Sequence, residues 1–284
     1  MMEKRYGRWL AVVGTLLFCG SVAFAARPNV AVFNFQMKSN SPDWLWLEKG
    51  LADRMITDLF QERSISVVQR DAMQKVAEKM FWVPEMMGDP HRLEAIRKAL
   101  EIDYLISGVY EIKGEQLSIT AIVVDFDSKK EVVRREVSGP TDQAMDLTRN
   151  LSAKLLSWFT KRSVEKILPE LPVWTRNMPA AKALYEGMDL YDQGRYPEGW
   201  LKFRQAARDD PQYLEAQYWV GKMFYFMDRY EHARWAYERF VYLDSSHPRL
   251  GDAIKEYLHT YEKLDTPQEK LLELYDGYRS INPS

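Results

Sequence analysis

Apolar residues follow two different periods in the first half of the chain, and these periods predict its elements. Residues 29–35 form a continuous apolar run rich in β-forming residues, as expected of a buried strand. Residues 65–68 form a second, shorter run of the same kind. Between the two runs, large apolar residues recur at steps of three and four, which places them on one face of a helix: Trp44, Leu47, Leu51, Met55 and Leu59.

Two further helices are predicted from their first residues. Asp71 and Asp89 each stand where a helical period begins, and a carboxylate at that position accepts hydrogen bonds from the free amides of the first turn. Pro90 fits the first turn because its missing N–H has no partner there. The apolar residues expected to point inward are Met73, Val76, Ala77, Met80, Leu93, Ile96 and Leu100.

The period then shortens to two. Segments 104–111, 116–126 and 131–138 are β-rich and are separated by short turns, which predicts an antiparallel meander. A long helix is expected from Thr141 or Asp142 onward, with Leu147, Leu151, Leu155 and Trp158 on one stripe. The order β-α-β-α-α-β-β-β-α predicts an α+β domain over residues 26–162, in which helices pack on a mixed sheet.

Residues 163–179 contain three prolines and no clear period. Because proline fixes φ, this segment is expected to be a semi-rigid linker. The alternative is that the segment packs tightly against one domain, with Val173 and Trp174 buried. The sequence alone leaves both interpretations open.

From residue 180 the sequence repeats at a spacing of 34 residues. Gly187 and Gly221 are separated by this spacing, and so are Tyr196 and Tyr230, Phe203 and Tyr237, and Ala206 and Phe240. An early small residue, a central aromatic residue and a late proline at this period are typical of tetratricopeptide units, each made of two antiparallel helices. We therefore expect an all-α repeat domain over 180–284, with units at about 180–213 and 214–247 and capping helices over 248–280.

The repeat predicts how its helices pack. Gly187 should let the two helices of the first unit approach closely, and Tyr196, Phe203 and Ala206 should fill their seam. In the third pair, Lys255 stands where the glycine is expected, which suits a terminal cap with a more polar outer face.

Repeats of this kind stack into a concave surface that binds proteins or peptides. The positions of the first helix of each unit place six residues on that side: Leu184, Met188, Tyr191, Tyr218, Lys222 and Tyr225. Aromatic residues provide a large contact area at a small entropic cost, so this set is the candidate partner-binding surface. The alternative is that these side chains pack against neighbouring helices or against the first domain.

The first 25 residues have the pattern of a secretory signal peptide. Basic residues precede the short apolar run 9–18, and Ala23-Phe24-Ala25 fits the cleavage rule of two small residues around one other. Cleavage near Ala25 would give a periplasmic or envelope protein. An uncleaved anchor and acylation at Cys19, the only cysteine, are the alternatives; Phe18 is bulkier than the small residue usual before an acylated cysteine.

Charge and motifs argue against two broad classes of function. Removal of residues 1–25 leaves 36 basic and 40 acidic residues (39 − 3 and 41 − 1), a net charge of −4, whereas nucleic-acid binding needs a concentrated basic surface. The four histidines are not paired at metal-ligand spacing, and no phosphate loop or nucleophile motif is present in the sequence. We predict a protein that is not an enzyme and has no cofactor or metal; an enzyme with an unfamiliar site is the alternative.

Four segments of the first domain resemble one family of bacterial envelope proteins. They are residues 30–35, the Leu51-Ala52-Asp53 segment, residues 67–71 with Val76 and Glu78, and residues 99–108, which end in Ser-Gly. The family includes the curli assembly/transport component, the flagellar outer-membrane protein FlgO, lipoprotein activators of cell-wall synthases and the related TolB N-terminal domain. The resemblance implies this α/β fold and an envelope location. The pore-forming members insert extra hairpins into a membrane, but here the predicted strands 116–126 and 131–138 are separated by a short turn, which leaves little sequence for such hairpins.

Together these features predict a non-catalytic exported adaptor in cell-envelope or surface-structure assembly. It would bind an envelope protein or peptide through the repeat groove and the α/β domain. The alternative is a ring-forming subunit of a curli-like outer-membrane secretion apparatus, which would oligomerise through the first domain and associate with the outer membrane.

Overall fold

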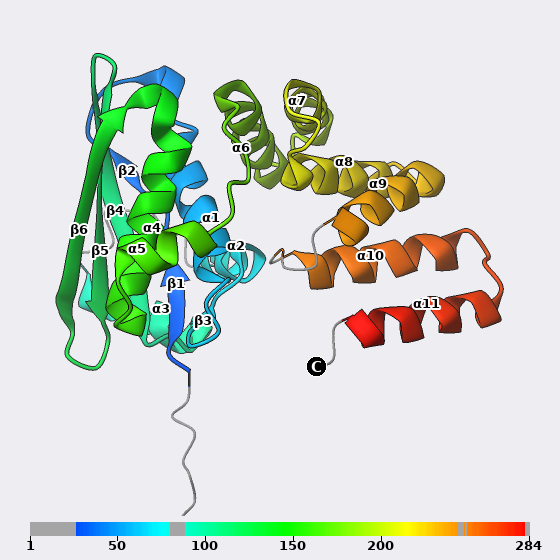
Figure 1. Cartoon of the computed structure of the whole chain (residues 1–284), viewed down its shortest axis with the longest axis horizontal. Helices are drawn as coiled ribbons and strands as arrows, with labels where there is room; N and C mark the ends of the chain where they lie inside the picture. Colours follow the sequence, from blue (N-terminus) through cyan, green and yellow to red (C-terminus); the bar gives the residue numbers. More distant parts are fainter. Residues whose placement is uncertain (1–26, 80–88, 244–246, 248, 282–284) are drawn as a thin grey trace, which may run out of the picture.

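A computed structural model of the 284-residue chain describes residues 27–79, 89–243, 247 and 249–281 (Figure 1). The segment interpreted as a signal peptide, with Cys19 and the expected cleavage site at Ala25, lies outside the described residues. The same is true of Met80, which was expected on a helix face, and of Pro248 at the start of the third helical pair.

The sheet has the strand order β3-β1-β4-β5-β6, and β2 pairs with β4 beside β1. Its first strands are parallel, whereas β4, β5 and β6 form the predicted antiparallel meander. The prediction of an α+β fold with a mixed sheet is therefore confirmed. The strands are β1 (Asn29–Val32), β2 (Gln36–Met37), β3 (Ser66–Val67), β4 (Tyr104–Lys113), β5 (Gln116–Asp125) and β6 (Lys130–Pro140).

Helices α1 and α4 lie on one side of this sheet and pack on each other (Figure 1). Asp89 caps α3 as predicted, because its side chain accepts hydrogen bonds from the amides of His91 and Arg92. The helices of this part are η1 (Pro42–Trp44), α1 (Leu47–Leu59), α2 (Arg70–Lys79), α3 (Pro90–Leu100), η3 (Thr141–Gln143) and α4 (Ala144–Thr160).

The prediction that the first strand extends to residue 35 is wrong. The strand ends at Val32, and the chain continues beside β4 into β2, with Phe33 and Phe35 still buried. Gly108 in β4 shows why this path needs a glycine. A Cβ at residue 108 would stand 2.4 Å from Phe35 Cε1 and 2.1 Å from the Thr120 carbonyl oxygen, so the ring of Phe35 occupies the space that a side chain would fill.

Residues 163–177 lie against the α/β part. They contain α5 (Val164–Ile167) and η4 (Leu168–Glu170). Arg149 of α4 donates hydrogen bonds to the carbonyls of Leu168 and Leu171, and Arg54 of α1 donates one to the carbonyl of Pro172. Trp174 is half-buried, whereas Val173 is exposed.

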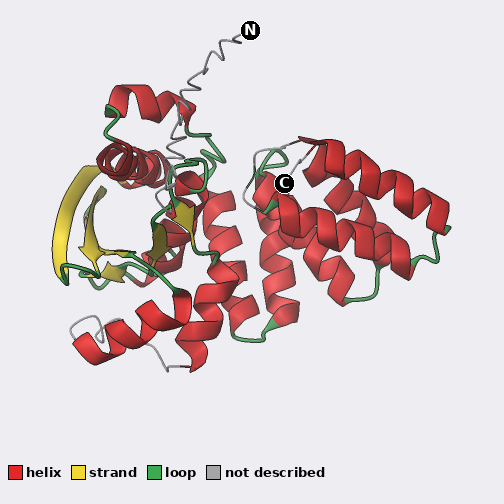
Figure 2. Cartoon of the chain, turned by 90° about the horizontal axis from the view of Figure 1, so that it is seen from below, coloured by secondary structure: helices red, strands yellow, loops and turns green. Residues whose placement is uncertain are grey.

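The rest of the chain forms successive helical hairpins (Figure 2). Each helix packs on the next in chain order. The helices are α6 (Met178–Asp192), α7 (Tyr196–Asp209), α8 (Leu214–Phe226), α9 (Tyr230–Leu243), α10 (Leu250–Lys263) and α11 (Gln268–Ile281).

The predicted close approach occurs twice at equivalent positions. A Cβ on Gly187 would stand 2.7 Å from the Phe203 ring, and a Cβ on Gly221 would stand 3.0 Å from the Tyr237 ring. Lys255 at the third position is exposed. Tyr196 does not fill the seam as predicted: it is 46% exposed, because the first residue of α7 lies at the end of the hairpin.

Candidate functional site

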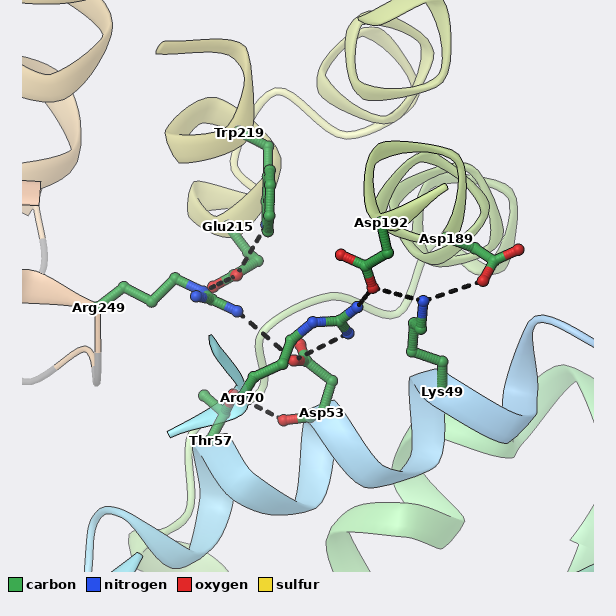
Figure 3. Close-up of polar contacts among 9 residues, drawn as sticks. All are labelled: Lys49, Asp53, Thr57, Arg70, Asp189, Asp192, Glu215, Trp219 and Arg249. Atoms are coloured by element: carbon green, nitrogen blue, oxygen red, sulfur yellow. Dashed lines mark hydrogen bonds and ion pairs between the residues drawn. The ribbon is translucent and has the colours of Figure 1, made fainter. Parts of the chain in front are cut away.

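The α/β part and the helical part meet where α1 packs on α6. Gly50 of α1 lets them touch, since a Cβ there would stand 2.8 Å from the ring of Tyr185. The same ring stacks on Trp46, with centroids 6.0 Å apart and planes inclined by 8°. Next to this contact lies a group of ion-paired side chains and one indole, buried or half-buried except for the exposed Asp189. We call it the junction network: Lys49, Asp53, Arg70, Asp189, Asp192, Glu215, Trp219 and Arg249 (Figure 3).

One half of the junction network joins α1 and α2 to the end of α6. Lys49 Nζ lies 2.9 Å from Asp189 Oδ1 and 2.7 Å from Asp192 Oδ2. Arg70 also binds Asp192, and its second guanidinium nitrogen lies 3.5 Å from Asp53 Oδ1. Asp192 therefore accepts from two cations of the α/β part.

The other half joins α1 to α8 and to the start of α10. Arg249 lies 3.5 Å from Asp53 Oδ1 through Nη2 and binds Glu215 through Nε. Glu215 also accepts from Trp219 Nε1 at 3.2 Å and lies 2.9 Å from His247 Nε2. Asp53 is thus placed between the guanidinium groups of Arg70 and Arg249.

The two buried acids of the junction network respond differently to their surroundings. Burial raises the pKa of Asp53, and the nearby Arg249 and Arg70 offset this only in part. Burial also acts to raise the pKa of Glu215, but Arg249 and His247 outweigh it and hold the pKa at about 2. Glu215 is therefore a permanent anion at neutral pH, and it holds Arg249 charged in return.

The junction network suits attachment better than chemistry. Its charges are largely paired, and the cavity between Asp53, Trp174, Tyr185 and His247 has a volume of about 10 Å³. That is room for about one water molecule, so this cavity could not admit a substrate. Asp53 and Arg70 belong to the segments that carried the family resemblance, which assigned them no role; no sequence pattern indicated that Glu215, His247 and Arg249 would join them.

The six residues predicted for the concave surface separate into two groups. Leu184, Met188 and Tyr218 are buried with at most 1% exposure, because the helices on either side and the α/β part pack on them. Tyr191, Lys222 and Tyr225 are half-buried, and they are the members of the set with surface left for a partner.

Lys222 lies among aromatic rings at the centre of this group. Its Nζ is 5.1 Å from the centroid of Trp219 and 5.6 Å from that of Tyr191, distances at which a cation is attracted to a ring face. Glu256 of α10 lies 3.9 Å from the same Nζ and accepts from the hydroxyl of Tyr237.

Two exposed rings extend this group to the hairpin ends. Tyr196 stacks on Phe226 with an interplanar angle of 14°, and both contact Tyr191. Phe226 is 55% exposed. We call Tyr191, Tyr196, Lys222, Tyr225 and Phe226 the aromatic surface. Phe226 was not among the residues predicted for this surface, although a large apolar residue in the last turn of a helix was a usable signal.

A groove lies on the other side of the α1–α6 contact. Its volume is about 760 Å³, within the range of roughly 300–1,000 Å³ common for ligand sites. Trp44 was predicted on an inward helix face, whereas it is half-buried and lines this groove. The lining residues are Asp43, Trp44, Trp46, Met178, Pro179, Lys182, Ala183, Glu186, Lys202 and Gln205.

Within residues 27–79, 89–243, 247 and 249–281, no three His, Cys, Asp or Glu side chains are grouped so that they could hold a metal ion. Over the same residues, no helix combines the length and the apolar character needed to cross a bilayer.

Comparison with known proteins gives only distant similarity. No protein-family model matches the chain, and no curated protein matches it. Among solved structures, lipoprotein GNA1162 from Neisseria meningitidis is 16% identical with a TM-score of 0.34, over 39% of this chain and 79% of that one. The LpoB C-terminal domain from Salmonella enterica is 10% identical with a TM-score of 0.28, over 42% and 87%. TolB from Acinetobacter baumannii is 13% identical with a TM-score of 0.34, over 47% and 28%.

Proposed function

We propose that this protein is a non-catalytic exported adaptor that binds another envelope protein through the aromatic surface of its helical part. The single observation that carries the proposal is the cluster of contacting rings Tyr191, Tyr196 and Phe226 beside Lys222, which remain half-buried or exposed. Single exposed aromatic side chains are common on protein surfaces, whereas aromatic side chains that contact one another and keep accessible surface are typical of binding hot spots.

In this proposal the helical part is a short array of tetratricopeptide-type units. The 34-residue spacing supports it, because Gly187 and Gly221 each receive the aromatic ring that lies 16 residues later in the sequence. Residues 26–162 would be one domain and 180–284 the other, with 163–179 as a packed connection. The junction network would hold the two domains in one orientation, so that a partner meets a fixed surface.

The location is proposed from the sequence. The N-terminal pattern and the family resemblance both favour export to the periplasm or envelope, with cleavage near Ala25. The partner would be an envelope protein or peptide.

Cross-linking in intact cells tests the proposed function. A photoactivatable residue placed at Tyr225 should capture a discrete protein partner, which mass spectrometry would identify. Tyr191→Ala combined with Phe226→Ala should abolish that cross-link. The matched control is Trp235→Ala with Tyr242→Ala, two exposed aromatic residues of α9 outside the aromatic surface, which should leave it intact. Recovery of the same partner from both double variants would overturn the proposal.

A ring-forming subunit is the second candidate, and strand β6 is the observation that favours it. β6 has 11 residues and forms one edge of the sheet, where unpaired backbone groups can pair with another chain. However, its side chains include Lys130, Glu131, Arg134, Arg135 and Glu136, and charges on an edge strand oppose such pairing. Light scattering on the purified protein decides the matter: a uniform ring would favour the second candidate, and a monomer would exclude it.

A further inference from the structure

We propose that the groove between η1 and the helices α6 and α7 binds a neutral oligosaccharide of pyranose rings. The groove is separate from the aromatic surface, so the proposal does not depend on the function inferred above. We call it the Trp44 groove. It draws residues from both parts of the molecule, and such interfaces are common places for ligand sites.

Stacked aromatic side chains form one wall of the Trp44 groove. Trp44 stacks on Trp46 at a centroid distance of 6.0 Å and an angle of 27°, and Trp46 stacks in turn on Tyr185. Both faces of Trp46 are therefore covered, whereas Trp44 is the outermost ring of the stack. The negative face of an aromatic ring attracts slightly positive C–H edges, and one face of a pyranose consists of such C–H groups.

The same wall contains a buried hydrogen-bond donor, the indole N–H of Trp46. Trp46 is only 7% exposed, and within the described residues its Nε1–H has no hydrogen-bond partner. A buried N–H without a partner costs about 1–3 kcal/mol. The Nε1 atom itself is buried, so a ligand hydroxyl can accept from it only if the wall of the groove moves to expose it.

The charges around the Trp44 groove favour a neutral ligand. Lys182 and Lys202 both lie on one carboxylate, that of Glu186, at 3.8 and 2.5 Å. Asp43 supplies the second negative charge, so the ionisable lining residues sum to zero. A charged ligand would lose as much as it gained here, whereas hydroxyl groups can donate to the carboxylates and accept from the lysines and Gln205.

The backbone around the groove argues against an extended peptide as the first choice. The lining residues come from η1, α6, α7 and the turn beside η1, and no sheet edge is among them. A peptide strand would therefore find no ladder of backbone partners. A proline-rich peptide, which needs only an aromatic groove, is the competing occupant that the experiment must exclude.

Isothermal titration calorimetry on the full exported chain tests the proposal. The probes are chitotetraose, cellotetraose and maltotetraose, three neutral tetrasaccharides of different linkage, together with a decaproline peptide. At least one sugar should bind with a Kd below about 1 mM. Trp44→Ala should weaken that binding by roughly tenfold or more, and Gln205→Ala, at an exposed position that folding does not need, by roughly threefold.

The control variant is Trp235→Ala, which removes an equally large ring from an exposed position of α9 and should leave sugar binding unchanged. Three results would overturn the proposal: no binding of any tetrasaccharide, sugar binding that both groove variants retain, or binding of decaproline alone. None of these results bears on the cross-link at Tyr225, so the two proposals can fail separately.

Discussion

The two contacts between the α/β part and the helical part differ in how completely they are closed. In the junction network, charges from α1 and α2 meet charges from α6, α8 and the start of α10 with almost no space between them. On the other side of the α1–α6 contact, the Trp44 groove leaves about 760 Å³ open. The α/β part and the helical part thus meet at one place with closely paired charges and at another with room for a ligand.

The chemistry of the two sides follows this difference. Buried charges are stable only when they are paired, and removal of one partner leaves the other uncompensated. Removal of an aromatic ring beside an open groove leaves its neighbours in contact with solvent, so the loss of stability is smaller than for a buried charge. The comparison therefore predicts large effects on folding from the junction network and small ones from the wall of the groove.

The largest effect is expected from Arg249→Met. This change removes the cation that lies between Asp53 and Glu215 and leaves two buried carboxylates without it. Loss of one partner of a buried ion pair costs about 3–5 kcal/mol, so the free energy of unfolding in urea should fall by about that amount.

Arg195→Met is the matched control. Arg195 forms an ion pair with Glu198 on the surface, where both side chains are about half exposed. Exposed pairs contribute roughly 0–1 kcal/mol. If the two arginine variants lose similar amounts of stability, the junction network is no more than a surface feature and the comparison fails.

The second effect depends on pH and concerns Glu215. Its pKa is about 2 in the folded protein, against an ordinary value of 4.5. Because the folded pKa is the lower one, ionised Glu215 stabilises the protein fully above pH 4.5, and this contribution is lost as the pH falls from 4.5 toward 2. Between about pH 6 and pH 3 the loss should be about 2 kcal/mol.

Urea unfolding of the natural protein and of Glu215→Gln at both pH values measures this loss. The glutamine variant has no such group to protonate, so its stability should fall less over the same interval. The pKa of Asp53 is raised in the folded protein, so its protonation at low pH has the opposite effect on stability. Asp53 is present in both proteins. An equal fall in both would show that Glu215 is not the group that responds to acid.

The fold was predictable from the sequence where the periods were strong. The meander, the helix face at Leu47 and Leu51 and the Asp89 cap all follow from local rules, and the structure confirms them. The first strand was predicted too long because Phe33 and Phe35 are apolar for another reason: both are buried after the strand has ended, and Phe35 lies over Gly108 in β4.

The candidate sites were only partly predictable. The repeat located Tyr191, Lys222 and Tyr225 on one side of the helical part, but it could not tell that the neighbouring Leu184 and Met188 would be covered. The junction network joins residues that are up to 196 positions apart. No local pattern encodes such a pairing, because it depends on how two separately periodic regions dock.

The third effect tests the contact shared by both sides, at Gly50. Gly50→Ala places a Cβ 2.8 Å from Tyr185 Cδ2, and the stacked Trp46 limits how far that ring can retreat. Overpacking costs about 1–3 kcal/mol, partly offset by up to about 1 kcal/mol of helix propensity. We expect a net loss of about 1–2 kcal/mol in urea unfolding.

Gly251→Ala is the control for the glycine change. A Cβ at Gly251 in α10 would meet nothing within 4 Å, so only the gain in helix propensity should remain, up to about 1 kcal/mol. The two substitutions should therefore change stability in opposite directions. A gain in both would mean that Tyr185 has room to move and that the α1–α6 contact is loose.

The smallest effect is expected from Trp44→Ala. Trp44 is half-buried, and its backbone carbonyl, which accepts from the Tyr110 hydroxyl at 2.9 Å, is kept in the variant. The expected loss is about 1 kcal/mol, whereas Trp46→Ala, which removes a ring covered on both faces, should cost about 3–5 kcal/mol. Since the two rings stack in one wall, chemical denaturation of the two variants compares the groove lining with the core directly behind it. Equal losses would place Trp44 in the core and leave the groove without a free aromatic face; unequal losses in the predicted order would separate the ring that holds the fold from the ring that is available to a ligand.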